Sequence, residues 1–247
     1  LIVTLGEVIV QEMAARIGAI TGKGTADLIR ERFGVKVTLF AMACLLVANF
    51  GTTIAQFAGI AASAELVGIS RYIAVPIISL LIGFLVMRGS YVKVEKFLLI
   101  LCLAALSYVI TAFLIKPDWG EIAESVVTPH LIIEPDYILT VLATIGTTIT
   151  PWGIFYMQAS VVDKGVDEED YPLTRIDIIF GTIWGNIISA FIIICTGTVL
   201  YANGIVVEEA EQAALALAPL AGEWSIVLFT TGMMGASILA AMVLPLS

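Results

Sequence analysis

The chain has 247 residues, of which 60% are hydrophobic and 13% charged, and its formal net charge is −9 at pH 7. Soluble globular domains carry about 25% charged residues, whereas the mean hydropathy here is +1.03. This composition excludes an ordinary soluble enzyme and predicts an all-α protein that crosses a membrane several times.

Several stretches are long and apolar enough to cross the hydrocarbon core as helices, which takes roughly 20 residues each. They lie at about 1–17, 37–64, 72–88, 97–115, 137–162, 176–202 and 224–247. The first stretch begins without a Met, and the last stops at Ser247. We therefore expect residues 1–247 to form a single transmembrane domain, truncated at both ends, with about seven membrane segments.

The connection after the first stretch contains a short amphipathic pattern at residues 25–34, which predicts a helix at the membrane interface. Thr25 is of a type that caps helix N-termini, and Gly34 is of the type that ends helices. We expect the helix to be capped by Thr25 and to stop at Gly34.

The stretch 37–64 carries polar residues at spacings of three and four, which places them on one helix face. These residues are Asn49, Thr52, Thr53 and Gln56. Later along the chain, prolines predict an irregular or partly helical connection at 116–136, and residues 208–218 predict a surface helix.

The basic residues are unevenly distributed among the connections. If the connection 18–36 is cytoplasmic, all of the 12 Lys and Arg residues except Arg71 and Lys116 fall on the cytoplasmic side. Cytoplasmic loops of membrane proteins carry this excess, so the distribution predicts the orientation.

The stretch 137–162 is interrupted by Gly-Thr-Thr-Ile-Thr-Pro-Trp-Gly at 146–153. Pro151 removes a backbone donor and clashes with the preceding turn, while Gly146 and Gly153 add backbone freedom. The sequence therefore predicts a discontinuous helix at 146–153. Membrane transporters use the carbonyls and helix ends at such breaks to hold ions, and a packing kink is the alternative.

Residues 11–24 carry a longer motif, Gln-Glu-Met-Ala-Ala-Arg-Ile-Gly-Ala-Ile-Thr-Gly-Lys-Gly. It resembles the Q-x-x-A-A-R-x-G-x-x-T-G-[KR] signature that ends the second helix of the Nramp (natural resistance-associated macrophage protein) divalent-metal transporters. The helix order and Gln158-Ala159-Ser160 match as well, so the resemblance covers the chain from the family's second helix to its eighth. It implies a partial inverted-repeat fold of the leucine-transporter type. The family's first discontinuous helix, with its D-P-G-N motif, is absent from this chain.

The break departs from the family pattern G-A-x-x-M-P-H, because this chain has Gly-Thr-Thr-Ile-Thr-Pro-Trp at 146–152. The break itself predicts a cation site made from free carbonyls near Thr147 and from the Thr150 side chain, and the resemblance implies that Thr150 replaces the metal-binding Met. Thioether sulfur suits transition metals, whereas hydroxyl and carbonyl oxygens suit Mg2+ or Ca2+. Mg2+ keeps several waters, and the shorter Thr leaves room for them.

The family's proton-handling positions are also changed. Thr53 and Gln56 occupy the acidic pair D-x-x-E of the family's third helix, and Gln158 aligns, with one gap, with a family His. Proton relays in membranes use Asp, Glu and His. Thr53, Gln56 and Gln158 are none of these. This pattern resembles the Nramp-related magnesium transporters, which implies transport without proton coupling. We expect Thr53, Gln56 and Gln158 to line the pathway.

Two acids lie in the first stretch. Glu12 is one turn before Arg16 and is expected to pair with it. Glu7 has no obvious local partner, and an intramembrane carboxylate is a functional candidate, so we expect it to line the ion pathway as well. Asn186, in the stretch 176–202, is interpreted as a packing residue.

These observations predict a transmembrane transporter domain at residues 1–247 and no enzyme. The main hypothesis is Mg2+ uptake without proton coupling through a bacterial inner (plasma) membrane. We expect the divalent cation to be the substrate and the lipid bilayer to surround the protein. No cofactor or nucleic acid is expected, and the expected state is a monomer. The alternatives are a proton-coupled Mn2+/Fe2+ Nramp transporter, a Na+-coupled amino-acid transporter of the same architecture and a non-transporting scaffold.

Overall fold

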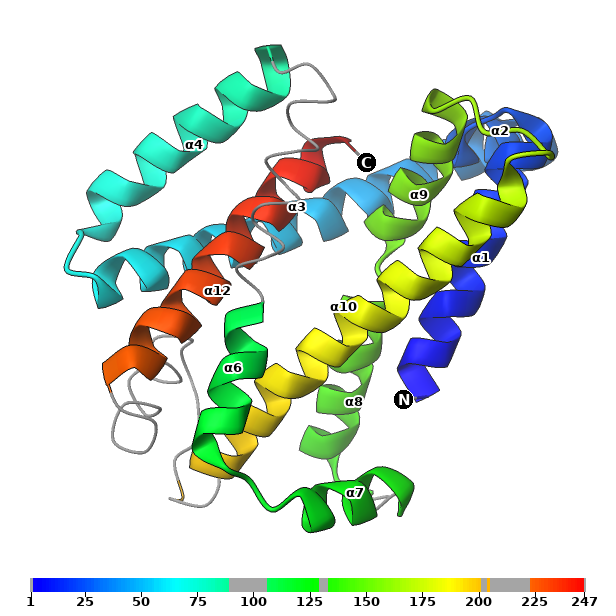
Figure 1. Ribbon diagram of the computed structural model, residues 1–247. Coiled ribbons are helices and arrows are strands. Elements are labelled where there is room, and N and C mark those ends of the chain that lie inside the picture. Colours follow the sequence, from blue (N-terminus) through cyan, green and yellow to red (C-terminus); the bar gives the residue numbers. More distant parts are fainter. Residues whose placement is uncertain (1, 89–105, 129–132, 201–203, 205–222, 247) are drawn as a thin grey trace. The chain divides into compact units, whose positions relative to one another are not determined.

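The computed structural model describes residues 2–88, 106–128, 133–200, 204 and 223–246, and these residues form helices joined by turns and short connections (Figure 1). The helices are α1 (Ile2–Thr21), α2 (Thr25–Phe33), α3 (Val35–Leu66), α4 (Arg71–Arg88), α6 (Leu106–Ile115), α7 (Trp119–Val127), α8 (Pro135–Thr148), α9 (Pro151–Asp163), α10 (Tyr171–Leu200) and α12 (Glu223–Val243), followed by the 3-10 turn η2 (Leu244–Leu246). The all-α class is confirmed. The surface helix expected at 208–218 and residues 97–105 lie outside the described residues.

Three helical stretches are long and apolar enough to cross a membrane: Val35–Leu66, Pro135–Asp163 and Tyr171–Val199. Shorter apolar helices cover Arg71–Met87 and Val227–Val243. Large apolar side chains on these helices remain exposed, for example Leu80 at 76% and Met87 at 86%. Extensive apolar exposure is unfavourable in water and marks a membrane or partner surface, so these faces suit contact with lipid.

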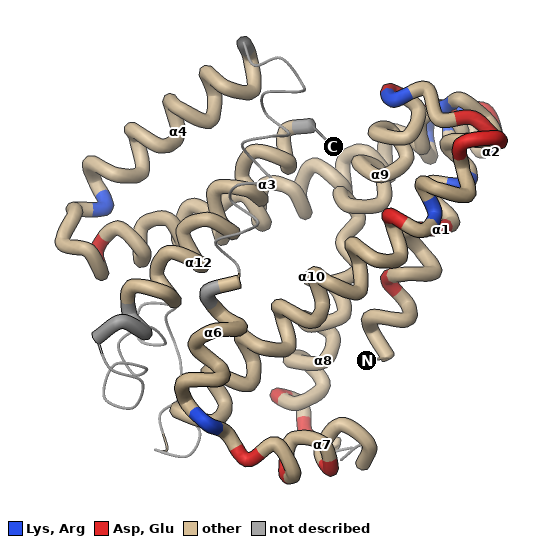
Figure 2. Tube along the Cα trace, in the orientation of Figure 1, with Lys and Arg blue, Asp and Glu red and all other residues tan. Residues whose placement is uncertain are grey.

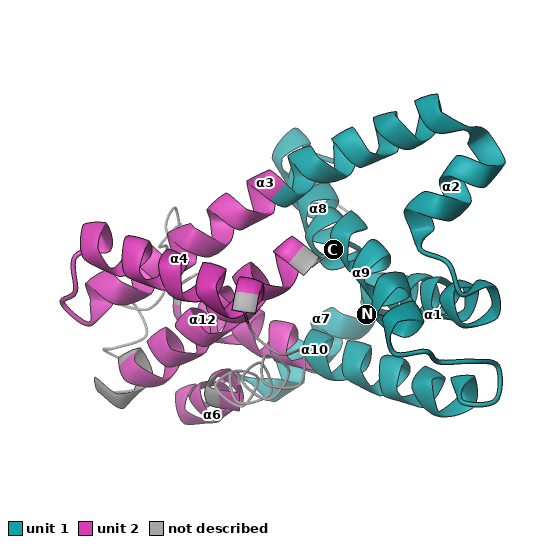
Figure 3. Cartoon of the chain, turned by 90° about the horizontal axis from the view of Figure 1, so that it is seen from above, with its two compact units in different colours: residues 1–49, 118–186, 247 teal, residues 50–117, 187–246 magenta. Residues whose placement is uncertain are grey.

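The chain divides into two compact units (Figure 3). Unit 1 consists of residues 1–49, 118–186 and 247, and unit 2 consists of residues 50–117 and 187–246. Each unit has a core of its own.

The core of unit 1 lies between α1 and α9, which pack against each other. Ala15 is fully buried there, and Ala19, Val161 and Ile178 complete the cluster. At Gly18, a Cβ atom would lie only 3.0 Å from the carbonyl oxygen of Gln158. Small residues allow this close approach of two helix backbones, and in α1 they belong to the 11–24 motif.

The core of unit 2 consists of two clusters. In one of them, the rings of Tyr108 on α6 and Phe229 on α12 meet edge to face, with centroids 5.1 Å apart. In the other, Ile60 on α3 packs with Ile82 on α4 and Met242 on α12. Unit 2 is therefore stabilised by large apolar side chains, whereas the α1–α9 contact depends on small ones.

Charged residues in unit 1 gather in two separate regions (Figure 2). Basic and acidic residues together surround α2, the end of α9 and the beginning of α10. The region around α7 and the start of α8 is acidic: Asp118, Glu121, Glu124, Glu134 and Asp136. Because it holds the Lys and Arg residues of unit 1, the first region is the one that the predicted orientation would place on the cytoplasmic side.

Helix α2 forms at the predicted place, but its beginning differs from the prediction. Gly24 is its N-cap residue, and no side chain caps it. The Thr25 hydroxyl instead donates to Oε1 of Gln158 at 2.6 Å, so the expectation that Thr25 caps the helix is wrong. The end at Gly34 is confirmed: its φ of 80° lies in the left-handed region, which glycine adopts without strain.

The α1–α9 contact gives a stability prediction. Gly18→Ala should destabilise the protein by about 1–3 kcal/mol, because the added methyl group meets backbone that cannot rotate away. Gly181→Ala on α10 is the matched control, since open space surrounds that position; it should be neutral or stabilising by up to about 1 kcal/mol. Thermal unfolding in detergent measures both, and equal midpoints for the two variants would contradict the prediction.

Candidate functional site

The discontinuity predicted at 146–153 is confirmed. Helix α8 ends at Thr148, and the N–H of Ile149 donates to the carbonyl of Ile145 at 2.8 Å. Helix α9 then begins at Pro151, with Thr150 as its N-cap residue. The break therefore consists of Ile149 and Thr150.

The backbone carbonyl of Thr147 is the group that Pro151 affects directly. In an α-helix this carbonyl would accept from the N–H four residues later, and residue 151 is a proline without an N–H. The Thr147 hydroxyl is already used, because it donates to the carbonyls of Ala143 and Thr144 at 2.9 and 3.2 Å. The carbonyl oxygen, and not the hydroxyl, is therefore the ligand that Thr147 can offer.

Thr150 contributes an oxygen on the other side of the break. Its Oγ1 accepts from the N–H of Gly153 at 3.3 Å, which caps α9. A threonine hydroxyl has two lone pairs and one proton, so Thr150 retains the capacity to bind an ion or an ion-bound water. The C-terminal end of a helix such as α8 carries a partial negative charge, so its carbonyls favour a cation.

Gln11 also lies at the break, although sequence reasoning assigned it only to a motif. A Cβ atom at Gly153 would be 2.8 Å from Thr150 Oγ1 and 3.2 Å from Gln11 Nε2, so both side chains crowd the same glycine. Among the described residues, Gln11 Oε1 and Trp152 Nε1 are buried atoms without a hydrogen-bond partner. Buried polar atoms are normally paired, so the Gln11 amide oxygen beside Thr150 retains the capacity to accept a hydrogen bond.

Two of the predicted pathway residues, Thr53 and Gln56, lie on α3 within unit 2. Both are half-buried, whereas the neighbouring Ile54 and Ala55 are exposed. The polar face of α3 is thus turned toward protein more than the adjoining apolar face is.

Gln158 belongs to unit 1 and lies on α9. It is 2% exposed, and its amide contacts the connection between α1 and α2. The structure thus places Gln158 near Lys23 and Thr25. Thr147 lies on α8, and Thr150 lies at the other end of α9.

Glu7 has a partner that is distant in the sequence. Asn186 Nδ2 donates to Glu7 Oε2 at 2.6 Å and to the carbonyl of Thr182 at 2.9 Å. The interpretation of Asn186 as a packing residue therefore missed a polar contact between α1 and α10. No local signal could have shown it, because 179 residues separate the two.

Glu12 forms the predicted pair with Arg16, at 3.4 Å. It also lies 3.6 Å from Arg175 and accepts from the Tyr171 hydroxyl at 2.6 Å. With all these partners from unit 1, Glu12 links α1 to the beginning of α10.

Carboxylate or thiolate clusters do not account for metal binding in the part of the chain that is described. No group of three or more His, Cys, Asp or Glu residues lies within metal-holding distance there. The break itself presents uncharged oxygens, namely the Thr147 carbonyl, the Thr150 hydroxyl and the Gln11 amide oxygen, and oxygens of this kind are hard ligands.

Comparison with known proteins places this chain in a family. The family model for natural resistance-associated macrophage protein-like (Nramp) proteins matches residues 1–247. The divalent metal cation transporter MntH of Erwinia tasmaniensis is 28% identical over 244 residues, which cover 94% of this chain and 57% of that protein. MntH of Bacillus subtilis is 24% identical over 251 residues, with coverages of 97% and 58%. The chain thus spans about half the length of the relatives it matches.

The fold and the break define an all-α integral membrane protein with a discontinuous helix in one of its apolar stretches. The match over the whole chain then identifies the family: the chain belongs to the Nramp family. The resemblance of the 11–24 motif is thereby confirmed.

The contact between Glu7 and Asn186 generates a second prediction. Asn186→Leu should destabilise the protein by about 1–3 kcal/mol, because it leaves a partly buried carboxyl group without its donor. Glu7→Leu in the same background should cost little more, so the two effects should not add. Thermal unfolding of the two single variants and the double variant in detergent measures this coupling.

Glu7→Leu combined with Thr38→Val is the control pair. The Thr38 hydroxyl donates to the carbonyl of Gly34, four residues earlier and immediately before α3, and not to Glu7. The effects of these two substitutions should therefore add. Additive effects for Glu7 and Asn186 would show that their hydrogen bond contributes nothing to stability.

Proposed function

We propose that the complete protein containing this chain is a transporter of divalent cations, with Mg2+ taken up without proton coupling. Family membership and the relatives' activity as divalent metal cation transporters (MntH) support the general activity. The observation that carries the choice of ion is the oxygen chemistry of the break at Ile149–Thr150.

The binding step of the proposal uses three oxygen atoms. The Thr147 carbonyl has lost its helical donor to Pro151, and the Thr150 hydroxyl is half-buried at the start of α9. The unsatisfied amide oxygen of Gln11 would accept a hydrogen bond from a water molecule of the hydrated ion. Mg2+ prefers oxygen ligands and keeps several waters, so a site of this composition favours Mg2+ over Mn2+ or Fe2+.

The proposed absence of proton coupling is supported by the residues at two positions of the expected pathway. Thr53 and Gln56 on α3 are polar but do not titrate near neutral pH, and Glu7 is the acid that remains in the proposed pathway. The Asn186 amide donates to its carboxylate. Without a proton, the inside-negative membrane potential would drive uptake by about 2.3 kcal/mol per charge for each 100 mV.

In this proposal the cation is the substrate, and the protein acts as a transporter, without a cofactor, in the bacterial inner membrane. The remaining ligands would come from the family's first discontinuous helix. The inverted-repeat arrangement and a monomeric state belong to the same proposal.

Reconstitution of the complete protein into liposomes tests the activity directly. One dye inside the vesicles reports Mg2+ and a second reports pH, while a potassium diffusion potential sets the membrane voltage. We expect Mg2+ uptake that increases with an inside-negative potential and leaves the internal pH unchanged. Mn2+ uptake with acidification, and no Mg2+ uptake, would refute the proposal; uptake of amino acids with Na+ would favour a different transporter class.

The role of Thr150 can be tested by restoring sulfur. Thr150→Met should shift the ratio of apparent affinities toward Mn2+ by about tenfold, because a thioether is a soft ligand that Mg2+ does not use. Thr148→Met is the matched control: Thr148 is adjacent, but its hydroxyl donates back to Thr144 within α8. Competition of Mn2+ with Mg2+ in the same flux assay measures the ratio. An equal shift in both variants would remove Thr150 from the site.

A further inference from the structure

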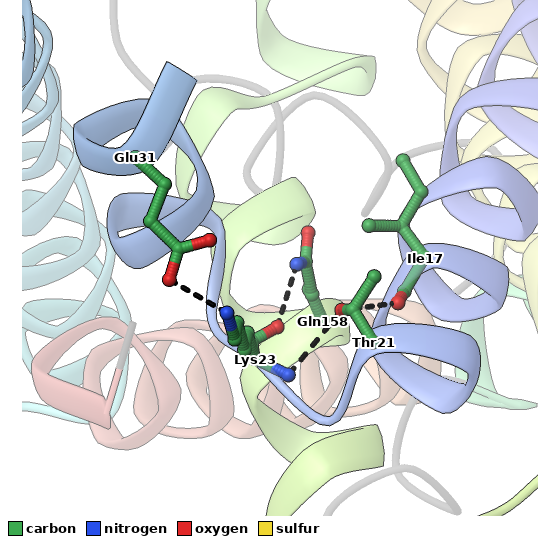
Figure 4. A network of polar contacts seen from close by, with 5 residues as sticks. All are labelled: Ile17, Thr21, Lys23, Glu31 and Gln158. Atoms are coloured by element: carbon green, nitrogen blue, oxygen red, sulfur yellow. Dashed lines mark hydrogen bonds and ion pairs between the residues drawn. The ribbon is translucent and has the colours of Figure 1, made fainter. Parts of the chain in front are cut away.

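Gln158 lies on the helix that begins at the break, and its amide contacts the connection between α1 and α2, which is cytoplasmic in the predicted orientation. It lies on α9 about two turns, or about 12 Å, beyond Thr150. Its amide uses both of its ends: Oε1 accepts from the Thr25 hydroxyl at 2.6 Å, and Nε2 donates to the carbonyl of Lys23 at 2.8 Å. The second of these bonds is drawn in Figure 4. With 2% of its surface exposed, Gln158 is almost completely enclosed by protein.

The connection that Gln158 contacts has a defined conformation of its own. The Thr21 hydroxyl donates to the carbonyl of Ile17 at 2.6 Å and accepts from the N–H of Lys23 at 3.3 Å. The Lys23 ammonium group pairs with Glu31 on α2 at 2.6 Å. These bonds, shown with Gln158 in Figure 4, join the end of α1 to α2 and turn the Lys23 carbonyl toward α9.

The backbone of Gln158 is also confined. A Cβ atom at Gly18 would lie 3.0 Å from the Gln158 carbonyl oxygen and 3.3 Å from its Cγ. Gln158 therefore contacts the last turns of α1 through its backbone and the beginning of α2 through its amide. A residue packed in this way on two elements transmits displacement, because close-packed interiors have little free volume to absorb it.

The N-terminal end of α9 is held by fewer backbone hydrogen bonds to the preceding helix. At Ile149–Thr150 the helical ladder is interrupted, and Pro151 cannot restore it. Element-terminal residues of this kind absorb the changes in φ and ψ when helices rotate. A change of angle between α8 and α9 would therefore occur at the break.

We propose that Gln158 is a positioning residue that couples α9 to the α1–α2 connection. Any rotation of α9 at the break then moves Lys23–Thr25 and α2 with it. Only the ion-dependent part of this inference rests on the proposed function; the coupling itself does not require the cargo to be Mg2+.

Hydrogen exchange measured by mass spectrometry on the complete protein tests the coupling. Gln158→Leu removes both bonds at similar size, and Thr25→Val removes one. Each should raise exchange in residues 23–28, by up to about tenfold for a lost hydrogen bond of about 1.4 kcal/mol. Because both variants break the Thr25–Gln158 bond, the double variant should exceed Gln158→Leu by little. Thr25→Ser retains the hydroxyl and should behave as wild type.

The control variant is Thr38→Val, because the Thr38 hydroxyl bonds to Gly34 beyond α2 and not to α9. It should leave exchange in residues 23–28 unchanged. Fully additive effects of Thr25→Val and Gln158→Leu would overturn the inference. If Gln158→Leu does not fold, the comparison of Thr25→Val with Thr25→Ser decides instead, and equal exchange in those two variants would overturn it.

Addition of MgCl2 separates a positioning role from a purely structural one. In the wild type, Mg2+ should change exchange both at residues 150–158 and at residues 23–28; in Gln158→Leu it should change exchange only at 150–158. An undiminished response at residues 23–28 in Gln158→Leu would overturn the inference. No response at 150–158 in the wild type would contradict the proposed function, and the Thr25–Gln158 comparison would then decide the coupling by itself.

Discussion

In an apolar surrounding every backbone N–H and C=O needs a partner, and Pro151 removes the helical donor of one carbonyl, that of Thr147. The arrangement of unit 1 follows from that constraint. Helix α8 stops at Thr148, Thr150 caps a new helix, and α9 begins at the proline itself. The interruption leaves the Thr147 carbonyl without its helical donor, and such a group is costly unless it binds water, an ion or another part of the protein.

Several polar side chains of unit 1 are bonded to distant segments, whereas one beside the break has a buried oxygen without a partner among the described residues. Away from the break, Glu7, Glu12 and Gln158 each have hydrogen-bond partners from distant segments. The first two contacts tie α1 to α10, and the third ties α9 to the beginning of α2. At the break, the Gln11 amide oxygen is buried without a partner among the described residues. Unit 1 therefore combines side chains bonded across distant segments with a few oxygens at the break that the described residues do not pair, and these are the oxygens that the proposed function uses.

Local patterns in the sequence predicted what depends on near neighbours. Pro151 located the break, Gly34 located the end of α2, and the spacing of Glu12 and Arg16 predicted their pair. The cap assigned to Thr25 was wrong, because the hydroxyl found a partner on α9 that lies 133 residues away in the sequence. The position of Gln11 beside Gly153 escaped prediction for the same reason: it depends on how α1 packs against α9.

The sequence by itself determined the helical membrane class, the motif that identifies the family and the chemical nature of the oxygens at 147–150. Hydropathy, proline and residue type act within a few positions, so these properties need no knowledge of the fold. Only the tertiary structure decided which side chains meet: Glu7 with Asn186, Gln11 with the break, and Gln158 with Lys23 and Thr25. The contacts of Gln11 and Gln158 depend on the close approach of α1 and α9, which small residues allow, and the contact of Glu7 depends on how α1 meets α10; each fit is a property of two helices together.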